Sequence, residues 1–148
     1  MKIIKYSFMM LGVAIIANIA LVQALTNLNQ FGLIYGTATI PAGKTVQLNN
    51  DVQKTELGVQ SVTNTRTFTP LTDPCPKCNI EVNLLRKLSS GKYDKVGTVF
   101  VKQGQTDYFL SQSVSQSFGE FNLSFRRVDA TALTTYVGFD WRVQDSKW

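Results

Sequence analysis

The most conspicuous candidates for site chemistry in this chain are two cysteines, Cys75 and Cys78. They lie in the run Asp73-Pro-Cys-Pro-Lys-Cys-Asn79. Two thiolates supply half of a tetrahedral zinc site, but the sequence has no histidine and no further cysteine to complete it. A thiol–disulfide exchange enzyme is a second interpretation, and such enzymes place the pair at the start of a helix. Here two prolines bracket Cys75 and a strand-like run follows Cys78, so the flanks favour a structural disulfide, formed within one chain or between chains.

The other residue types offer little for catalysis. The absence of histidine removes the common general base and every His-based triad. Carboxylates are sparse, and Glu81 and Glu120 fall on the polar faces of predicted strands, where a solvated carboxyl keeps its ordinary acidity. No nucleophile elbow, phosphate loop or dinucleotide fingerprint occurs. The sequence therefore predicts a protein with no catalytic residues, no metal and no cofactor.

Basic residues gather around one predicted hairpin. They are Arg86, Lys87, Lys92, Lys95 and Lys102. One interpretation is a patch for an anionic polymer, such as an envelope glycan or a lipid surface. The other is that lysines protect strand edges from pairing with other chains, and the acidic Asp94 and Asp107 among them favour this second interpretation. The low net charge and the leader described below argue against a nucleic-acid partner.

Aromatic residues are numerous, and most fall on apolar faces of predicted strands, so Phe100, Tyr108 and Phe118 are expected in the core. Tyr93, Tyr136 and Trp148 are expected to be partly exposed. Exposed aromatic rings on a sandwich can stack on sugar rings, which keeps a lectin-like glycan-binding module open. Scattered exposed rings are also ordinary surface.

The first 24 residues have the organisation of a secretory signal peptide. Lys2 and Lys5 form a basic start, the apolar run Phe8–Val22 follows, and Val22-Gln-Ala24 places small residues at the cleavage site. The run has 15 residues, interrupted by a polar asparagine, whereas a spanning helix needs about 20 apolar residues. We therefore expect cleavage after Ala24 and a secreted protein beginning at Leu25, with an uncleaved anchor as the alternative.

The remaining chain alternates with a period of two residues. In Ala132–Val143 the odd positions, among them Phe139 and Trp141, are mostly apolar, and the even positions are mostly polar. Phe118–Val128 repeats the pattern with Phe121, Leu123 and Phe125 on the apolar face and Glu120, Asn122 and Ser124 on the polar face. The short connection Asp129-Ala-Thr131 predicts that these two strands form an antiparallel pair.

Further strand-like runs lie upstream, separated by glycine, proline, asparagine and serine. They cover Leu33–Ile40, Lys44–Leu48, Val59–Phe68, Ile80–Leu84, Lys95–Lys102 and Thr106–Leu110. Seven to nine short strands without a convincing amphipathic helix predict an all-β fold, an antiparallel β-sandwich of jelly-roll or immunoglobulin-like type, in a single domain over residues 25–148. A closed barrel remains an alternative topology. The polar run Ser111–Ser117 is expected to be an exposed loop or a solvent-facing edge.

These patterns together predict a secreted, non-catalytic β-sandwich protein that acts by binding or assembly at the cell envelope or outside the cell. A protein partner or self-assembly is favoured, with a glycan or an anionic surface as further partners. The segment 25–35 could form an edge strand on its own sheet or on a neighbouring subunit. The alternative functions are a thiol oxidoreductase using Cys75 and Cys78, and a lectin-like module.

Overall fold

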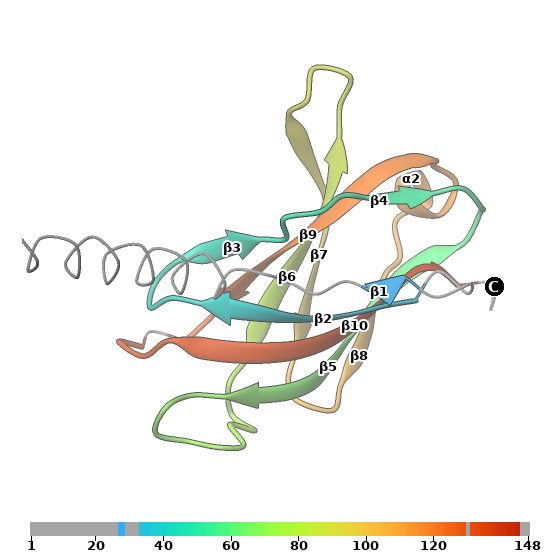
Figure 1. Cartoon of the computed structure of the whole chain (residues 1–148). Coiled ribbons are helices and arrows are strands. Elements are labelled where there is room, and N and C mark those ends of the chain that lie inside the picture. The colour runs from blue at the N-terminus through green and yellow to red at the C-terminus, as the bar shows by residue number, and fades with distance from the viewer. Residues whose placement is uncertain (1–26, 29–32, 130, 146–148) are drawn as a thin grey trace, which may run out of the picture.

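The structure of the chain is a computed structural model that describes residues 27–28, 33–129 and 131–145 (Figure 1). The predicted signal peptide, residues 1–24, lies outside the described residues. Within the described ranges, no helix is both long and apolar enough to cross a membrane.

Ten strands and one helical turn make up the described part of the chain. The strands are β1 (Asn27–Leu28), β2 (Leu33–Ile40), β3 (Thr45–Gln47), β4 (Val52–Lys54), β5 (Val59–Phe68), β6 (Ile80–Lys87), β7 (Tyr93–Val101), β8 (Thr106–Phe109), β9 (Gly119–Arg127) and β10 (Thr135–Asp145), and the helical turn is α2 (Gln112–Ser115). Sheet A has the order β1-β2-β10-β5-β8, and sheet B has the order β3-β9-β6-β7 with β4 also paired to β9. All pairs are antiparallel, so the predicted all-β antiparallel sandwich is confirmed.

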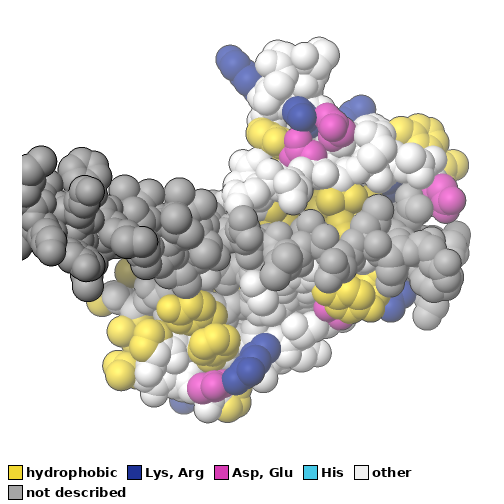
Figure 2. All heavy atoms as spheres, in the orientation of Figure 1, with side chains coloured by type: hydrophobic (Ala, Val, Ile, Leu, Met, Phe, Trp, Pro, Cys, Tyr) yellow, Lys and Arg dark blue, Asp and Glu magenta, His cyan; other side chains and the backbone are white. Residues whose placement is uncertain are grey.

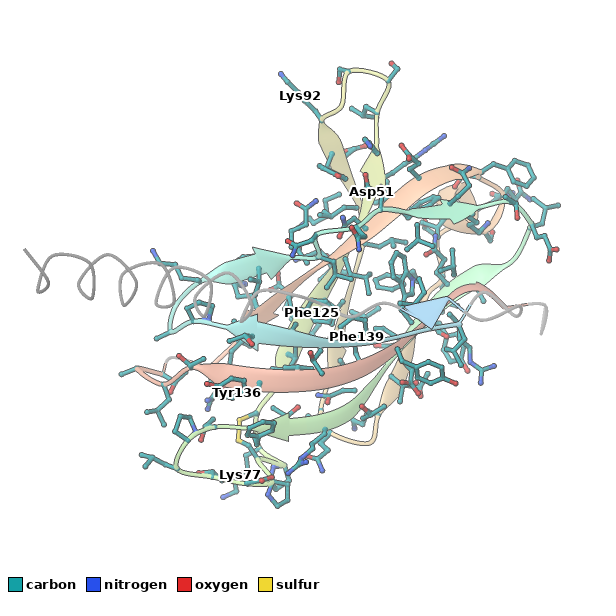
Figure 3. All side chains as sticks on the ribbon, in the orientation of Figure 1. Asp51, Lys77, Lys92, Phe125, Tyr136 and Phe139 are labelled. Atoms are coloured by element: carbon teal, nitrogen blue, oxygen red, sulfur yellow. A yellow bond between two sulfur atoms is a disulfide. The ribbon has the colours of Figure 1, made fainter. Side chains whose placement is uncertain are left out.

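The core lies between the two sheets and follows the alternation seen in the sequence. Phe139 and Trp141 of β10 are buried from sheet A, and Phe121 and Phe125 of β9 are buried from sheet B. The rings of Phe125 and Phe139 meet across the interface with their centroids 4.8 Å apart (Figure 3). The predicted inward faces of both strands are therefore confirmed.

The predicted pairing of these two strands is wrong. β9 pairs with β3, β4 and β6 in sheet B, whereas β10 pairs with β2 and β5 in sheet A. The chain after Arg127 thus crosses from one sheet to the other instead of turning back beside the same strand. The alternation of apolar and polar residues identifies the inward face of a strand but not the strand that pairs with it. A short connection can join two paired strands of one sheet or two strands in different sheets.

The segment 25–35 contributes to two strands. Asn27 and Leu28 lie opposite Tyr35 and Ile34, so β1 is an edge strand on the chain's own sheet. The part from Leu33 onward belongs to β2, which pairs with β10 along its length. Residues 25–26 and 29–32 lie outside the described part of the chain.

The run Ser111–Ser117 is more than the exposed loop that its composition predicted. It contains α2, and Val114 at its centre is fully buried against the core. The side chain of Lys54 is also fully buried and donates hydrogen bonds to the carbonyl oxygens of Ser115 (3.2 Å) and Ser117 (2.9 Å). Burial lowers the pKa of the Lys54 amine, and the two carbonyls at the end of the turn partly offset the desolvation of its charge.

Candidate functional site

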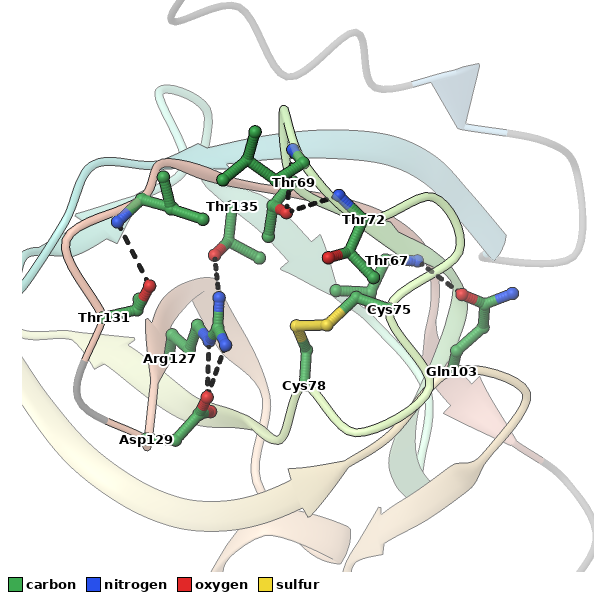
Figure 4. The surroundings of a disulfide bond; sticks show 12 residues. Thr67, Thr69, Thr72, Cys75, Cys78, Gln103, Arg127, Asp129, Thr131 and Thr135 are labelled. Atoms are coloured by element: carbon green, nitrogen blue, oxygen red, sulfur yellow. Dashed lines mark hydrogen bonds and ion pairs between the residues drawn. A yellow bond between two sulfur atoms is a disulfide. The ribbon is translucent and has the colours of Figure 1, made fainter.

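The predicted disulfide between Cys75 and Cys78 is present within one chain (Figure 4). Both cysteines are buried, in the loop between β5 and β6. The Cys75 amide donates to the carbonyl of Thr67 (2.7 Å), which fixes this loop to the end of β5. No described helix begins at either sulfur, so the arrangement lacks the helix dipole and the exposure that activate an exchanging thiol. The bond therefore has the surroundings of a structural disulfide.

A second polar cluster fixes the base of the β6–β7 hairpin, which projects beyond the sandwich (Figures 1 and 3). The Asp51 carboxylate accepts hydrogen bonds from the hydroxyl of Tyr93 (2.6 Å) and the amide of Asn122 (2.8 Å), and it forms an ion pair with Lys87 (2.8 Å). Burial raises the pKa of Asp51, but these three donors outweigh it, and the net pKa lies below the ordinary value. The carboxylate is fully engaged and acts as an anchor for the hairpin.

The five basic residues do not form one patch. Lys87 is bound to Asp51 and to Glu120 (3.2 Å), and Arg86 lies directly opposite Asp94. Lys92 and Lys95 are exposed on the hairpin, but Lys102 follows the other end of β7. The two ends of β7, a strand of nine residues, are about 26 Å apart. The structure therefore splits the basic set and neutralises part of it.

The two carboxylates on polar strand faces are also paired. Glu81 accepts a hydrogen bond from Arg126 (2.5 Å) and another from Asn83, and the Arg126 bond is the main reason that the Glu81 pKa is lowered. Glu120 is bound to Lys87, as described above. The pKa of Glu81 is lowered, whereas a general acid needs a raised one, and among the described residues no group of His, Cys, Asp or Glu could hold a metal ion.

Asp51→Asn should lower stability at neutral pH by about 1–3 kcal/mol, because Lys87 loses its ion pair and three donors lose a charged acceptor. The folded pKa of Asp51 lies below its unfolded value, so its contribution is present above about pH 4 and disappears as the pH falls through the folded pKa. The variant should therefore show a shallower loss of stability than the wild type as the pH falls below about 4. Urea unfolding at a series of pH values measures this.

Asp73→Asn is the matched control for this experiment, because Asp73 forms an ion pair (2.7 Å) with Arg66 in which both side chains are about half exposed. Such a pair contributes little. An acid dependence of Asp51→Asn that equals the wild-type dependence would contradict the anchoring role.

The aromatic residues only partly follow expectation. Tyr93 is exposed and bound to Asp51, Tyr136 is half-buried, and Trp148 lies outside the described residues. The expectation that Phe100, Tyr108 and Phe118 lie in the core is wrong, because all three are exposed. Tyr108 precedes the buried Phe109 on β8, and alternation allows only one of two adjacent residues to point inward.

The outer face of sheet A carries four aromatic side chains, Tyr35, Phe68, Tyr108 and Tyr136, which we call the aromatic face. The strand register places Tyr35 opposite Asp140, Tyr108 opposite Ser61, and Tyr136 opposite Phe68. The Phe68 and Tyr136 rings stack with their centroids 4.8 Å apart. Tyr35 and Tyr108 are 46% and 39% exposed. Tyr35 is level with Asp140, four residues from Tyr136 along β10, so it lies about 13 Å from the stacked pair. Tyr108 is level with Arg142, six residues from Tyr136, so it lies about 20 Å from the pair.

Threonines and small residues fill the space between these aromatic positions. Thr37 lies opposite Gly138, and Thr63 and Thr106 share a hydrogen bond of 2.7 Å between their hydroxyls. Burial raises the pKa of Asp140 in this surface, and the charge of Arg142 opposes that shift. Figure 2 shows hydrophobic side chains as separate groups on this side of the molecule, with polar surface between them. Arg66, Asp140 and Arg142 also lie on this face, and the Arg66 guanidinium lies 5.0 Å from the centroid of the Phe68 ring. The face therefore has separate aromatic contact points with charged and polar groups between them.

The outer face of sheet B has a different chemistry. Arg126 donates to Glu81, Asn83 donates to Glu81 (3.0 Å), and Thr98 donates to Asn83 (2.7 Å), so a hydrogen-bonded chain crosses the sheet. Phe100, opposite Glu81, is an exposed aromatic residue on this face. Both outer faces contain hydrogen-bonded polar groups and exposed aromatic residues, but sheet A carries four aromatic side chains, whereas sheet B carries Phe100 and, on its hairpin, Tyr93.

The described residues thus define an antiparallel β-sandwich with one buried disulfide. No family model matches the chain, and no curated protein matches it. Among solved structures, the chain is similar to the crystal structure of the Yersinia pseudotuberculosis-derived mitogen (YPM), at 13% sequence identity over 84% of this chain and 92% of that chain, with a TM-score of 0.47. The likeness is one of fold alone.

Proposed function

We propose that this chain is a secreted, non-catalytic protein that acts by binding a protein partner through the aromatic face. The observation that carries the proposal is the contrast between the two outer surfaces. Sheet A carries four aromatic side chains on its outer face, Tyr35, Tyr108 and the stacked Phe68 and Tyr136, whereas sheet B carries Phe100 and the Asp51-bound Tyr93. Tyrosine is enriched among the residues that dominate binding energy at protein interfaces.

The charged groups of the described residues support binding over catalysis. The carboxylates with lowered pKa, Asp51, Glu81 and Asp129, are each bound to a cation. A cavity of about 210 Å³ lies near the start of β10, but the Arg127 in its wall is bound to Asp129 and to the hydroxyl of Thr135. Asp51, Glu81, Asp129 and Arg127 are thus engaged in ion pairs that stabilise the fold.

Secretion rests on two features of the chain. Residues 1–24 have the basic start, apolar middle and small-residue end of a signal peptide. The Cys75–Cys78 disulfide is the form that cysteines adopt in an oxidising compartment. An N-terminal sequence beginning at Leu25 in the secreted protein would establish the cleavage site.

Photo-crosslinking tests the location of the binding surface. The residue-25–148 protein would carry a benzophenone side chain at Tyr35 or Tyr108, with Phe100 on the opposite sheet as the matched control position. After incubation with envelope and extracellular fractions of the source organism, we expect one discrete protein adduct from the two sheet A positions and none from Phe100. Adducts of equal yield from all three positions would contradict the proposal.

Glycan binding is the second candidate, favoured by the half-buried Phe68–Tyr136 stack beside threonine hydroxyls. A sugar ring can pack on such a pair while its hydroxyls bind the threonines. A glycan array with the same protein distinguishes the candidates, because a specific glycan signal lost in Tyr136→Ala would replace the protein-partner proposal.

A further inference from the structure

The sheet edges of the sandwich differ in how they are protected against pairing with other chains. On sheet B, one edge is divided into two three-residue strands, β3 and β4, and the other is β7, with Asp94 and Lys95. A register shift between Leu84 and Leu85 also distorts the pairing of β6 with β7. On sheet A, β8 has only four residues and includes Asp107. Short strands, charges and irregularities are the usual devices that block strand addition.

β2 has none of these devices. It is eight residues long, from Leu33 to Ile40, and contains no charged residue and no proline. Its register with β10 is continuous from Leu33 to Ile40, without a bulge. On the side away from β10, the described pairing with β1 involves only Ile34 and Tyr35. A long, regular and uncharged edge of this kind is a template for another strand.

The chain's own N-terminal segment is too short to protect the rest of β2 after the proposed cleavage. In the β1 register, Asn27 lies opposite Tyr35, so a continuation to Leu25 would reach no further than Thr37. Cleavage after Ala24 would remove every residue that could lie opposite Ala38, Thr39 and Ile40 in that register. The second half of the β2 edge is thus available to another chain.

We propose that this edge is a self-association site, at which β2 of a second copy pairs antiparallel with β2 across a two-fold axis. An antiparallel pair of identical strands places the same residues on both sides, which a charged strand would oppose by like-charge repulsion. β2 brings no charge to such a pair. The contact joins the A sheets of both copies into one continuous sheet through main-chain hydrogen bonds.

This inference goes beyond the proposed function, because it assigns a second surface with its own partner. A continuous sheet places the aromatic faces of both copies on one side, so the dimer presents two binding faces together. Bivalent presentation strengthens binding to a partner that is itself repeated or clustered. The overlap, Ala38–Ile40 with Thr39 on the axis, covers three residues and is much smaller than a standard interface, so the dimer is weak and forms at high concentration.

Sedimentation velocity on the residue-25–148 protein tests the site, from about 1 µM to about 1 mM. We expect a reversible monomer–dimer equilibrium whose dissociation constant rises about tenfold or more in Thr39→Lys, because two lysines then meet across the axis. Thr45→Lys is the matched control, the same exchange at the β3 edge of sheet B, and should leave the equilibrium unchanged. Circular dichroism confirms that each variant is folded, and Thr37→Lys replaces Thr39→Lys if the latter is not.

A wild-type protein that stays monomeric over the whole range would overturn the proposal. So would a dimer that Thr39→Lys and Thr45→Lys weaken equally. The crosslinking experiment tests the protein-partner proposal independently of this one. An adduct of the chain with a different protein supports the protein-partner proposal, whereas an adduct of twice the chain mass reports self-association.

Discussion

Trp141→Ala should lower the free energy of unfolding by about 3–5 kcal/mol. Trp141 is fully buried in β10, and its indole N–H donates to the Oε1 of Gln60 (3.0 Å), which is itself fully buried. The substitution removes the largest buried side chain and leaves the Gln60 amide without this partner. The Nε2 of Gln60 already has no partner among the described residues, so the loss adds the cost of an unsatisfied polar group to that of the cavity.

Urea unfolding measures this effect, and a second pair of variants separates its two causes. Trp141→Phe keeps most of the ring volume but removes the N–H, so it isolates the hydrogen bond. Gln60→Leu should be less costly in the Trp141→Phe background than in the wild type, because Gln60 then has no indole donor to lose. A loss of less than about 1 kcal/mol for Trp141→Ala would contradict this description of the core.

Gly36→Ala should destabilise the protein by about 2–3 kcal/mol, although it adds one methyl group. A Cβ at Gly36 would lie 2.4 Å from the end of the Phe139 ring, far inside van der Waals contact. Phe139 cannot move away freely, because its ring packs against Phe125 in the centre of the core. β2 and β10 are neighbours at this point, so the clash lies within sheet A itself.

Thermal unfolding of Gly36→Ala provides the measurement, and Phe139→Leu provides the control. The smaller leucine leaves room for the added methyl group, so the double variant should be more stable than the sum of the two single effects predicts. Exact additivity of the two substitutions would show that the Cβ finds space without contacting the ring.

The fold class was predictable because burial on one side of a strand leaves a direct trace in sequence. Phe121 and Phe125 alternate with polar neighbours, and so do Phe139 and Trp141. The identity of a strand's pairing partner leaves no such trace. The sequence therefore predicts a β9–β10 pair, whereas the two strands lie in different sheets. Period-two patterns also fail at a bulge, and the register shift opposite Gly138 and Phe139 reverses the inward face within β5.

The candidate site was less predictable than the fold. Tyr108 and Phe109 are adjacent aromatic residues, and only the register of β8 against β5 decides which of them is exposed. The exposure of Tyr35 could have been predicted, because Tyr35 follows the buried Ile34 on a strand whose residues alternate between buried and exposed. Lys54 gave no signal of its burial, since two carbonyls distant in sequence satisfy its amine. The split of the basic patch likewise depends on which end of β7 each lysine occupies.

The affinity of the crosslinked protein partner for variants of the residue-25–148 protein tests the aromatic face most directly. Isothermal titration calorimetry would compare the wild type with Tyr35→Ala/Tyr108→Ala and with Phe100→Ala, which removes an aromatic side chain, 50% exposed, from the opposite sheet. If the aromatic face binds the partner, the double variant binds about a hundredfold more weakly than the wild type, and Phe100→Ala binds as the wild type does. Equal affinity of the double variant and the wild type, with both folded, would contradict it.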